Sequence, residues 1–170
     1  PTPQKDINVV RAQFYLGDLH GNALKLFYCL IHWGILEVTE NDYLRFVLIY
    51  TGLDNPSSDE EIAGHIKQFN ELLSRCKVNN RATLYLIGDD LADRGVNDYL
   101  TLKILEKLSK DEQRIQIVMS NHGLSFLQAH EKVMMGAKGA DYSPVMLEGR
   151  HSVSLINLKR LIEKNLISIE

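Results

Sequence analysis

The sequence has only two cysteines, no long hydrophobic run and no basic cluster, and each shortage excludes a class of protein. Cys29 and Cys76 lie far apart on apolar helical patterns without metal-type spacing. We interpret both as buried small hydrophobic residues of a soluble protein in a reducing, cytoplasmic compartment, not as a disulfide. No apolar stretch is long enough to cross a bilayer and no charged-then-apolar leader opens the chain, so we expect no membrane span. The net charge of −3, without a face-sized run of Lys or Arg, disfavours nucleic acid as a partner.

What remains is the composition of one globular domain. The chain has 170 residues, 45% hydrophobic and 24% charged, which is enough to bury a sizeable core. It opens with Pro1-Thr2-Pro3 instead of methionine. We therefore expect a trimmed or excised piece of something longer.

Hydrophobic patterning predicts strand, polar loop and helix, repeated three times. The strands are expected at residues 9–16, 83–87 and 115–119. The helices are expected at residues 23–33, 60–76, 98–108, from about 124, and 152–165, with 43–50 fitting either a helix or a strand and 136–149 an exposed loop. This alternation predicts an α/β fold with a parallel or mixed sheet flanked by helices. Ligands of such sheets bind beyond the carboxyl ends of the strands.

A cluster of polar residues follows each predicted strand. In Gly17-Asp18-Leu19-His20-Gly21, Asp18 and His20 alternate, so both side chains point to the same side of an extended chain and can share a divalent cation. Gly88-Asp89-Asp90-Leu91-Ala92-Asp93-Arg94-Gly95 offers bridging carboxylates and an arginine suited to bidentate phosphate binding. Ser120-Asn121-His122-Gly123 adds an amide oxygen for a metal and a histidine for acid or base chemistry.

Each cluster by itself also fits an ordinary structural role. A Gly-Asp pair after a strand is usually a turn, an Asn-His pair often caps a helix, and an Asp-Arg pair is often a solvated ion pair of little energetic worth. The conjunction favours function, because three clusters of metal- and phosphate-type residues fall at the strand ends of one predicted sheet.

Taken in order, the three clusters resemble the calcineurin-like metallophosphoesterases, and most closely their phosphoprotein phosphatase branch. That family is marked by Gly-Asp-x-His-Gly, then Gly-Asp-x-x-Asp-Arg-Gly, then Gly-Asn-His-Glu or -Asp. The resemblance covers residues 14–122 and implies the N-terminal part of a calcineurin-like α/β sandwich. Residues 39–80 are longer than the family's usual spacer, so we expect a helical insertion there within one catalytic domain over residues 1–170.

The resemblance also implies a set of metal ligands. Asp18 and His20 would hold the first metal, Asp89 would bridge both metals, and Asn121 would hold the second. The cofactors implied are two divalent cations, for which manganese is our expectation and iron or zinc the alternatives. The second motif has one extra residue, so counting back from its end selects Asp90 as the bridge; we favour Asp89 because it directly follows the strand.

The catalytic roles follow from the same resemblance. His122 would protonate the leaving group, Asp93 would orient His122, and Arg94 would bind the phosphate. Ser120 and Gly123 depart from the family's glycine and acid, as in divergent phosphatases that intracellular bacteria secrete into host cells. Two later metal-binding histidines of the family have no match, since His130 and His151 do not end strands. This again predicts a fragment, one that self-associates and has little activity by itself.

Three functions remain open at this point. The first is a metal-dependent phosphomonoesterase acting on phosphorylated proteins, of undetermined Ser/Thr or Tyr specificity. The second is a hydrolase of dinucleoside polyphosphates or other small phosphoesters. The third is a degenerate, non-catalytic phosphatase domain that serves as a binding scaffold. The Asp93-Arg94-Gly95 ending and the protein-sized insertion favour the first.

Overall fold

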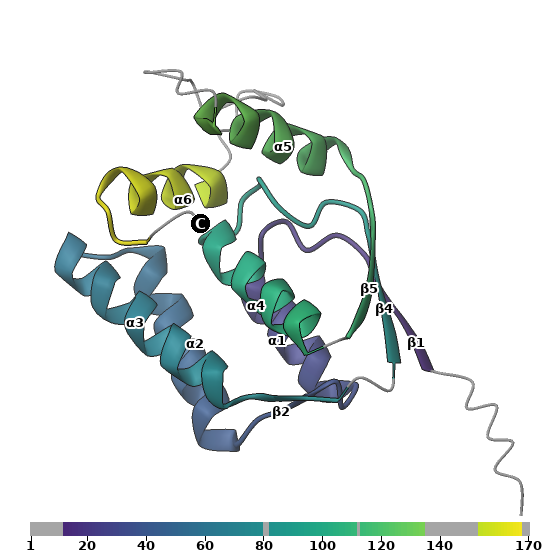
Figure 1. The fold of residues 1–170 in the computed structure, drawn as a ribbon. Helices are drawn as coiled ribbons and strands as arrows, with labels where there is room; N and C mark the ends of the chain where they lie inside the picture. The colour runs from purple at the N-terminus through teal and green to yellow at the C-terminus, as the bar shows by residue number, and fades with distance from the viewer. Residues whose placement is uncertain (1–11, 80–81, 112, 135–152, 168–170) are drawn as a thin grey trace, which may run out of the picture.

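A three-stranded parallel sheet forms one side of the computed structural model (Figure 1). The structure describes residues 12–79, 82–111, 113–134 and 153–167. The strands of the sheet, in spatial order, are β1 (Ala12–Leu16), β4 (Ala82–Ile87) and β5 (Arg114–Val118). Because all three strands run parallel, their carboxyl ends meet at one edge, and each predicted polar cluster follows one of them. The predicted α/β class is confirmed.

Figure 1 shows the described helices on one side of this sheet. They are α1 (Ala23–His32), α2 (Glu40–Asp54), α3 (Asp59–Arg75), α4 (Asp98–Lys110), α5 (Asn121–Met134) and α6 (Val153–Glu163). The chain encodes where they begin: the Asn22 side chain caps α1 by accepting from the amide of Lys25 at 2.9 Å, and Ser58 caps α3 in the same way. Gly34, with φ +66°, follows the end of α1.

Residues 40–75 form a pair of helices, α2 and α3, and the segments that precede and follow this pair lie side by side. The segment that fitted helix or strand lies in α2, and the Thr39 side chain caps this helix by accepting from the amide of Asp42 at 3.1 Å. Next to this pair, β2 (Leu36–Glu37) and β3 (Lys77–Val78) pair antiparallel, a contact the sequence did not predict. Because β2 and β3 are neighbours, α2 and α3 leave and rejoin the main body of the domain at one place. Whether they are an insertion relative to the family stays a prediction.

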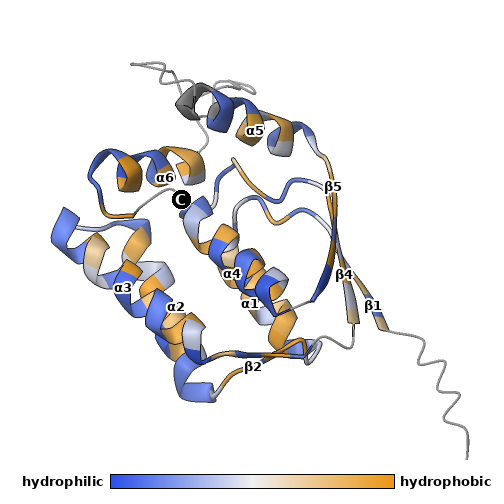
Figure 2. Cartoon of the chain, in the orientation of Figure 1, coloured by the Kyte–Doolittle hydropathy of each residue, from blue (hydrophilic) through white to orange (hydrophobic). Residues whose placement is uncertain are grey.

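Aromatic side chains join four helices into one core. The rings of Phe27 and Phe46 lie 4.5 Å apart, those of Phe46 and Phe69 5.4 Å, and those of Phe69 and Tyr99 6.5 Å. The three phenylalanines are fully buried, so each contributes on the order of 2–3 kcal/mol of transfer free energy. Figure 2 shows that α2 and α3 are hydrophilic on the outside of the pair and hydrophobic where the two helices meet. The same buried cluster includes Leu16 of β1 and Leu84 and Leu86 of β4, so the helices pack against the sheet.

The boundaries differ from the prediction chiefly at α5. This helix begins at Asn121 rather than near Leu124, because Ser120 acts as its cap: the Ser120 hydroxyl accepts from the amide of Gly123 at 2.9 Å and its carbonyl from that of Leu124 at 2.9 Å. Asn121 and His122 therefore lie on the first helical turn rather than in a loop. The start of the first predicted strand, the predicted loop at 136–149 and His151 lie outside the described residues.

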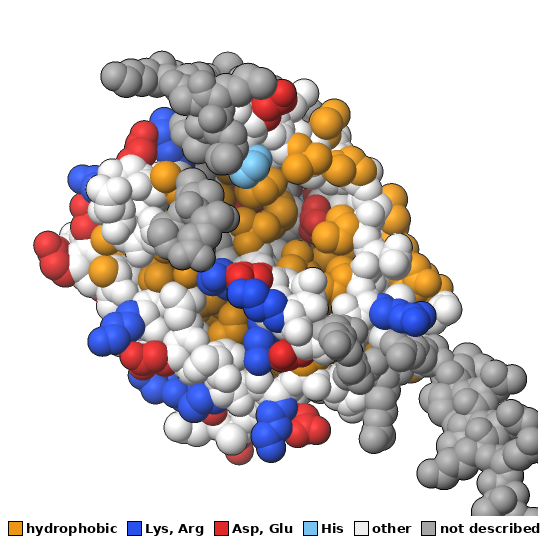
Figure 3. Space-filling view, in the orientation of Figure 1, with side chains coloured by type: hydrophobic (Ala, Val, Ile, Leu, Met, Phe, Trp, Pro, Cys, Tyr) orange, Lys and Arg blue, Asp and Glu red, His pale blue; other side chains and the backbone are white. Residues whose placement is uncertain are grey.

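Hydrophobic side chains remain exposed around β5 and the start of α5. Ile117, Val118, Met119, Leu124 and Leu127 are each about half exposed, and Figure 3 shows hydrophobic side chains gathered over this part of the visible face. Exposed apolar patches of this kind often mark contact surfaces. Self-association through such a patch stays a prediction.

The state of the cysteines and the length of the helices test two predictions: that the chain has no disulfide and that it has no membrane span. Cys76 is buried and Cys29 half-buried, and both are free thiols. Burial raises the pKa of the Cys76 thiol to about 11, so that it behaves as a small hydrophobic residue. Within the described part of the chain, no helix combines the length and the apolar character that crossing a bilayer requires.

Candidate active site

The first two polar clusters lie on loops that are bonded to each other through their backbones. The first loop (residues 17–22) follows β1, and the second loop (residues 88–95) follows β4. The carbonyl of Asp89 accepts hydrogen bonds from two first-loop amides, that of His20 at 2.7 Å among them, and the amide of Gly95 donates to the carbonyl of His20 at 2.7 Å. These bonds fix the side chains of the two loops relative to each other.

The crossing of the two loops is tight enough to select residue types. A Cβ added at Gly95 would lie 2.0 Å from the backbone oxygen of Gly21, so only glycine fits there. His20 and Ala92 have φ values of 54° and 56°, in the left-handed region that L-residues seldom adopt. Such backbone strain concentrates at functional sites, because the surrounding structure must over-determine it.

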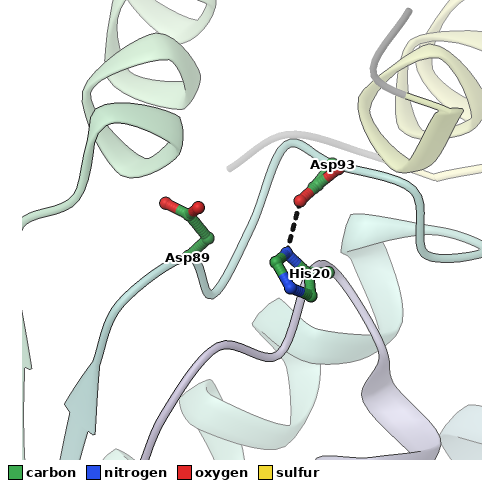
Figure 4. A group of neighbouring side chains, drawn as sticks. All are labelled: His20, Asp89 and Asp93. Carbon is green, nitrogen blue, oxygen red and sulfur yellow. Dashed lines mark hydrogen bonds and ion pairs between the residues drawn. The ribbon is translucent and has the colours of Figure 1, made fainter. Parts of the chain in front are cut away.

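His20 has a carboxylate near each of its ring nitrogens, and Figure 4 shows the ring facing Asp93. Its Nδ1 lies 2.5 Å from Oδ2 of Asp93, and its Nε2 lies 3.9 Å from Oδ2 of Asp18. The other oxygen of Asp18 accepts from the amide of Asp89 at 3.1 Å. A hydrogen on Nδ1, shared with Asp93, leaves the lone pair of Nε2 facing Asp18, which is how proteins prepare an imidazole for a cation. The two ligands predicted for the first metal therefore converge.

His122 approaches the same group from the start of α5. Its Nδ1 lies 2.8 Å from the carbonyl oxygen of Ala92, and a carbonyl only accepts, so Nδ1 carries the hydrogen. Its Nε2 faces Asp89 and Asp93, whose nearest carboxylate oxygens lie 3.9 and 4.0 Å away. Asp93 contacts His20 more closely than His122, so the predicted orientation of His122 by Asp93 stays a prediction.

Three of these side chains could hold a metal ion as they stand. One ligand atom each from His20, Asp89 and Asp93 lies within 4.8 Å of the others. Imidazole and carboxylate together suit manganese, iron or zinc. Asp93 was predicted as a catalytic residue rather than a ligand, so its place in this group was not foreseen. The group is half-buried, which leaves it open to a substrate.

The two adjacent aspartates of the second loop differ in environment. Asp89 lies in the group just described, whereas Asp90 is 5% exposed and lies under the start of α5. Burial raises the pKa of Asp90, with a smaller contribution from the charge of Asp89. The structure thus places Asp89, and not Asp90, beside His20 and His122.

The remaining two predicted residues are exposed at the edge of the site. Arg94 directly follows Asp93, and its amide donates to Oδ1 of Asp93 at 2.7 Å. Asn121 is the first residue of α5. Their predicted roles toward a phosphate and a second metal stay predictions.

A buried pair of polar residues, Asp98 and Ser154, lies beneath the second loop and was not predicted from the sequence. Asp98 and Ser154 are both fully buried. Burial raises the pKa of the Asp98 carboxyl to about 7, and the charges of Asp90 and Asp93 add to the effect. No sequence signal pointed to Ser154, because a serine at the start of an amphipathic helix is usually a cap or a surface residue.

A parallel sheet whose strand ends carry Asp18 and His20, then Asp89 and Asp93, then His122, fits the phosphoprotein phosphatase type of fold. Residues 83–170 match the model of the WipA-like phosphatase domain, and the chain belongs to that family. The solved phosphatase domain of the Legionella effector WipB superposes with a TM-score of 0.79 at 31% identity, covering 92% of this chain and 56% of that one.

A second group of relatives matches a shorter segment. The symmetrical bis(5'-nucleosyl)-tetraphosphatases of two Buchnera aphidicola strains, from Acyrthosiphon pisum, are 30% identical over 100 residues, covering 59% of this chain and 35% of theirs. The chain thus spans about a third of the length of these curated relatives and just over half of the WipB domain.

Proposed function

We propose that this protein is a metal-dependent phosphomonoesterase that acts on phosphorylated proteins. The observation that supports this most is the position of His122, whose Nε2 lies 3.9 Å from Asp89 and 4.0 Å from Asp93. An imidazole at this position, beside the carboxylates at the strand ends, is placed to give a proton to the leaving oxygen of a phosphoester bound there.

The residues at the strand ends fit a pair of divalent cations. Asp18 and His20 would hold the first, Asp89 would bridge to the second, and Asn121 would complete the second site. The fit rests on donor chemistry and position, since Nε2 of His20 and Oδ2 of Asp18 lie 3.9 Å apart and the carboxylate of Asp89 lies beside them. When bound, such cations activate water and stabilise in-line displacement at phosphorus. Manganese is our first choice, with iron and zinc as alternatives.

The chain's own residues then have separate tasks. His122 keeps its Nδ1 hydrogen on the carbonyl of Ala92, so the proton it gives to the leaving oxygen is the one on Nε2. Asp93 fixes the ring of His20 through Nδ1. Arg94, exposed beside Asp93, binds the phosphate through two parallel N–H···O bonds.

Two observations favour a protein substrate over a small one. The second loop ends in Asp93-Arg94-Gly95, the ending that marks the phosphoprotein phosphatase branch, and the WipB relative is the phosphatase domain of an effector. The main alternative is a dinucleoside polyphosphate, which the Buchnera relatives are named for. A non-catalytic scaffold is the third candidate, and the convergence of His122 on Asp89 speaks against it.

The test is a comparison of substrates on the complete protein, stripped of metal and then supplied with Mn²⁺, Fe²⁺ or Zn²⁺. Phosphoserine, phosphothreonine and phosphotyrosine peptides of one sequence are assayed beside diadenosine tetraphosphate. We expect metal-dependent release of phosphate from at least one peptide, with a higher kcat/KM than for the dinucleotide. Faster hydrolysis of the dinucleotide selects the alternative. Binding of the peptides without hydrolysis under any metal selects the scaffold.

A further inference from the structure

Ser154 holds the backbone of Asp93 on both of its polar groups. The amide of Asp93 donates to Oγ of Ser154 at 3.0 Å, and the carbonyl of Asp93 accepts from the amide and the hydroxyl of Ser154, each at 2.9 Å. The two residues are 61 positions apart, and Ser154 lies on the first turn of α6. The helix thus reaches the second loop through one serine.

Asp98 holds the neighbouring residue of the same loop. Both of its carboxyl oxygens lie within hydrogen-bond distance of the amide of Ala92, at 3.2 and 3.0 Å, and its side chain also hydrogen-bonds with that of Ser154. The carbonyl of Ala92 is the group that binds Nδ1 of His122. Asp98 therefore binds the Leu91–Ala92 peptide. Ser154, through the amide of Asp93, binds the next peptide, whose carbonyl holds the imidazole.

The pair has no room to relax. Asp98 and Ser154 are both 0% exposed. A Cβ added at Gly21 would lie 2.8 Å from Oγ of Ser154 and 3.2 Å from Oδ1 of Asp98, so the pair also lies against the first loop. Hydrogen bonds in such a dry environment are strong, and leaving one unmade is costly.

Each donor of this network has an acceptor. The amide of Asp93 donates to Oγ of Ser154, the amide of Ser154 donates to the carbonyl of Asp93, and the amide of Ala92 donates to the carboxyl of Asp98. The Ser154 hydroxyl has two acceptors within reach, the carbonyl of Asp93 and the carboxyl of Asp98. An asparagine at 98 keeps an oxygen that accepts from Ala92 and has an amide that can donate to Oγ of Ser154.

We propose that Asp98 and Ser154 are positioning residues of the active site, which fix the backbone of Ala92 and Asp93 so that His20 and His122 keep their places. The proposal rests on the proposed function for its kinetic consequences only. No residue of α6 was predicted to belong to the active site. According to this proposal, α6 supports the site through Ser154. Neither residue touches the reacting atoms.

The experiment compares Ser154→Ala, Asp98→Leu and Asp98→Asn with the control Asn157→Ala, in the complete protein. Asn157 also lies on α6 and donates to the carbonyl of Val96 at 2.6 Å, so its variant removes one bond of α6 beyond the second loop. Turnover is measured with phenyl phosphate, a poor leaving group, and p-nitrophenyl phosphate, a good one. The ¹⁵N shifts of the His20 and His122 rings are measured in the metal-free protein.

We expect Ser154→Ala and Asp98→Leu to lower kcat on phenyl phosphate by ~10–100-fold, as loss of residues that orient a functional group does. The loss on p-nitrophenyl phosphate should be smaller, because that leaving group needs less help from His122. The ring nitrogen shifts of His20 or His122 should change. Asp98→Asn should retain the wild-type shifts and most of the turnover, and Asn157→Ala should change neither.

Contrary results are separable from failure of the proposed function. Unchanged ring shifts in Ser154→Ala, or equal losses on both substrates, overturn the positioning role even when the protein is an active phosphatase. If the wild type is inactive, the proposed function fails, and the ring shifts of the metal-free variants still decide the positioning role. If Asp98→Leu does not fold, Ser154→Ala and Asp98→Asn carry the test.

Discussion

Nδ1 of His20 lies 2.5 Å from Oδ2 of Asp93, across 73 residues of sequence. The first residue follows β1 and the second follows β4, so this contact joins the two loops at the level of the side chains. The bond between the amide of Gly95 and the carbonyl of His20 joins them at the level of the backbone. Because of this double attachment, a change in one loop is expected to be felt in the other.

Replacing Asp89 by asparagine should lower the amount of divalent cation bound per chain. The change removes one charge from the group formed with His20 and Asp93 while keeping the size of the side chain. Asp90→Asn is the matched control, because it makes the same change one residue further on, at a buried carboxyl outside that group. Elemental analysis after metal loading measures both. Equal stoichiometry in Asp89→Asn and the wild type contradicts the assignment of Asp89.

Replacing His122 by asparagine should slow turnover on substrates with poor leaving groups by ~10²–10⁴-fold, the usual worth of general acid catalysis. Metal content and the free energy of unfolding should change little, since an asparagine amide can still donate to the carbonyl of Ala92. On p-nitrophenyl phosphate the loss should be much smaller. An equal loss on a phosphopeptide and on p-nitrophenyl phosphate shows that His122 is not the acid.

A methyl group at Gly95 should destabilise the fold, whereas one at Gly64 should not. The Cβ at Gly95 would meet three backbone atoms of Gly21 at 2.0–2.7 Å, which a rotamer change cannot relieve, so a loss of at least ~2 kcal/mol is expected. Gly64 lies within α3 with nothing within 4 Å of its Cβ position, and alanine should stabilise there by ~0.5–1 kcal/mol. Urea unfolding measures both; a neutral Gly95→Ala refutes the steric reading of the crossing.

The stability of the metal-free protein should carry a pH dependence that originates in Asp98. Its pKa is about 7 in the folded chain against an ordinary value of 3.8, so the folded state binds more protons between these pH values. Stability therefore falls as the pH rises through this window. At ~1.4 kcal/mol per pKa unit, the free energy of unfolding of Asp98→Asn, relative to that of the wild type, should rise by on the order of 2 kcal/mol from pH 5 to pH 8. Urea unfolding of both proteins at the two pH values measures this, and a constant difference contradicts the origin in Asp98.

Local patterns in the sequence were sufficient to predict the sheet and the residues at its edge. The strand ends could be read because an apolar run followed by Gly-Asp has a local signature, as at Gly88-Asp89. The third strand end, where Ser120-Asn121 follows the apolar run, completes the set, and the parallel sheet brings Asp18, Asp89 and His122 to one edge. That step needs only the alternation of strand and helix.

Contacts between distant segments could not be predicted from the sequence, because no local pattern in either segment indicates its partner. The tie of Ser154 to Asp93 depends on where α6 docks, and the pairing of β2 with β3 depends on the path of α2 and α3. The closeness of Asp93 to His20 rather than His122 is decided by side-chain packing. Such choices follow from the three-dimensional fit, which one sequence does not encode position by position.

The dependence of Asp93 on Ser154 also bears on the time at which the site is made during protein synthesis. A ribosome adds roughly 5–20 residues per second, so the 61 residues between them take about 3 to 12 s to be translated. Throughout that interval Asp93 exists without the three hydrogen bonds that Ser154 makes to its backbone in the folded chain. The sheet and the first two loops can assemble on the nascent chain, but the site reaches its final geometry only after α6 has emerged.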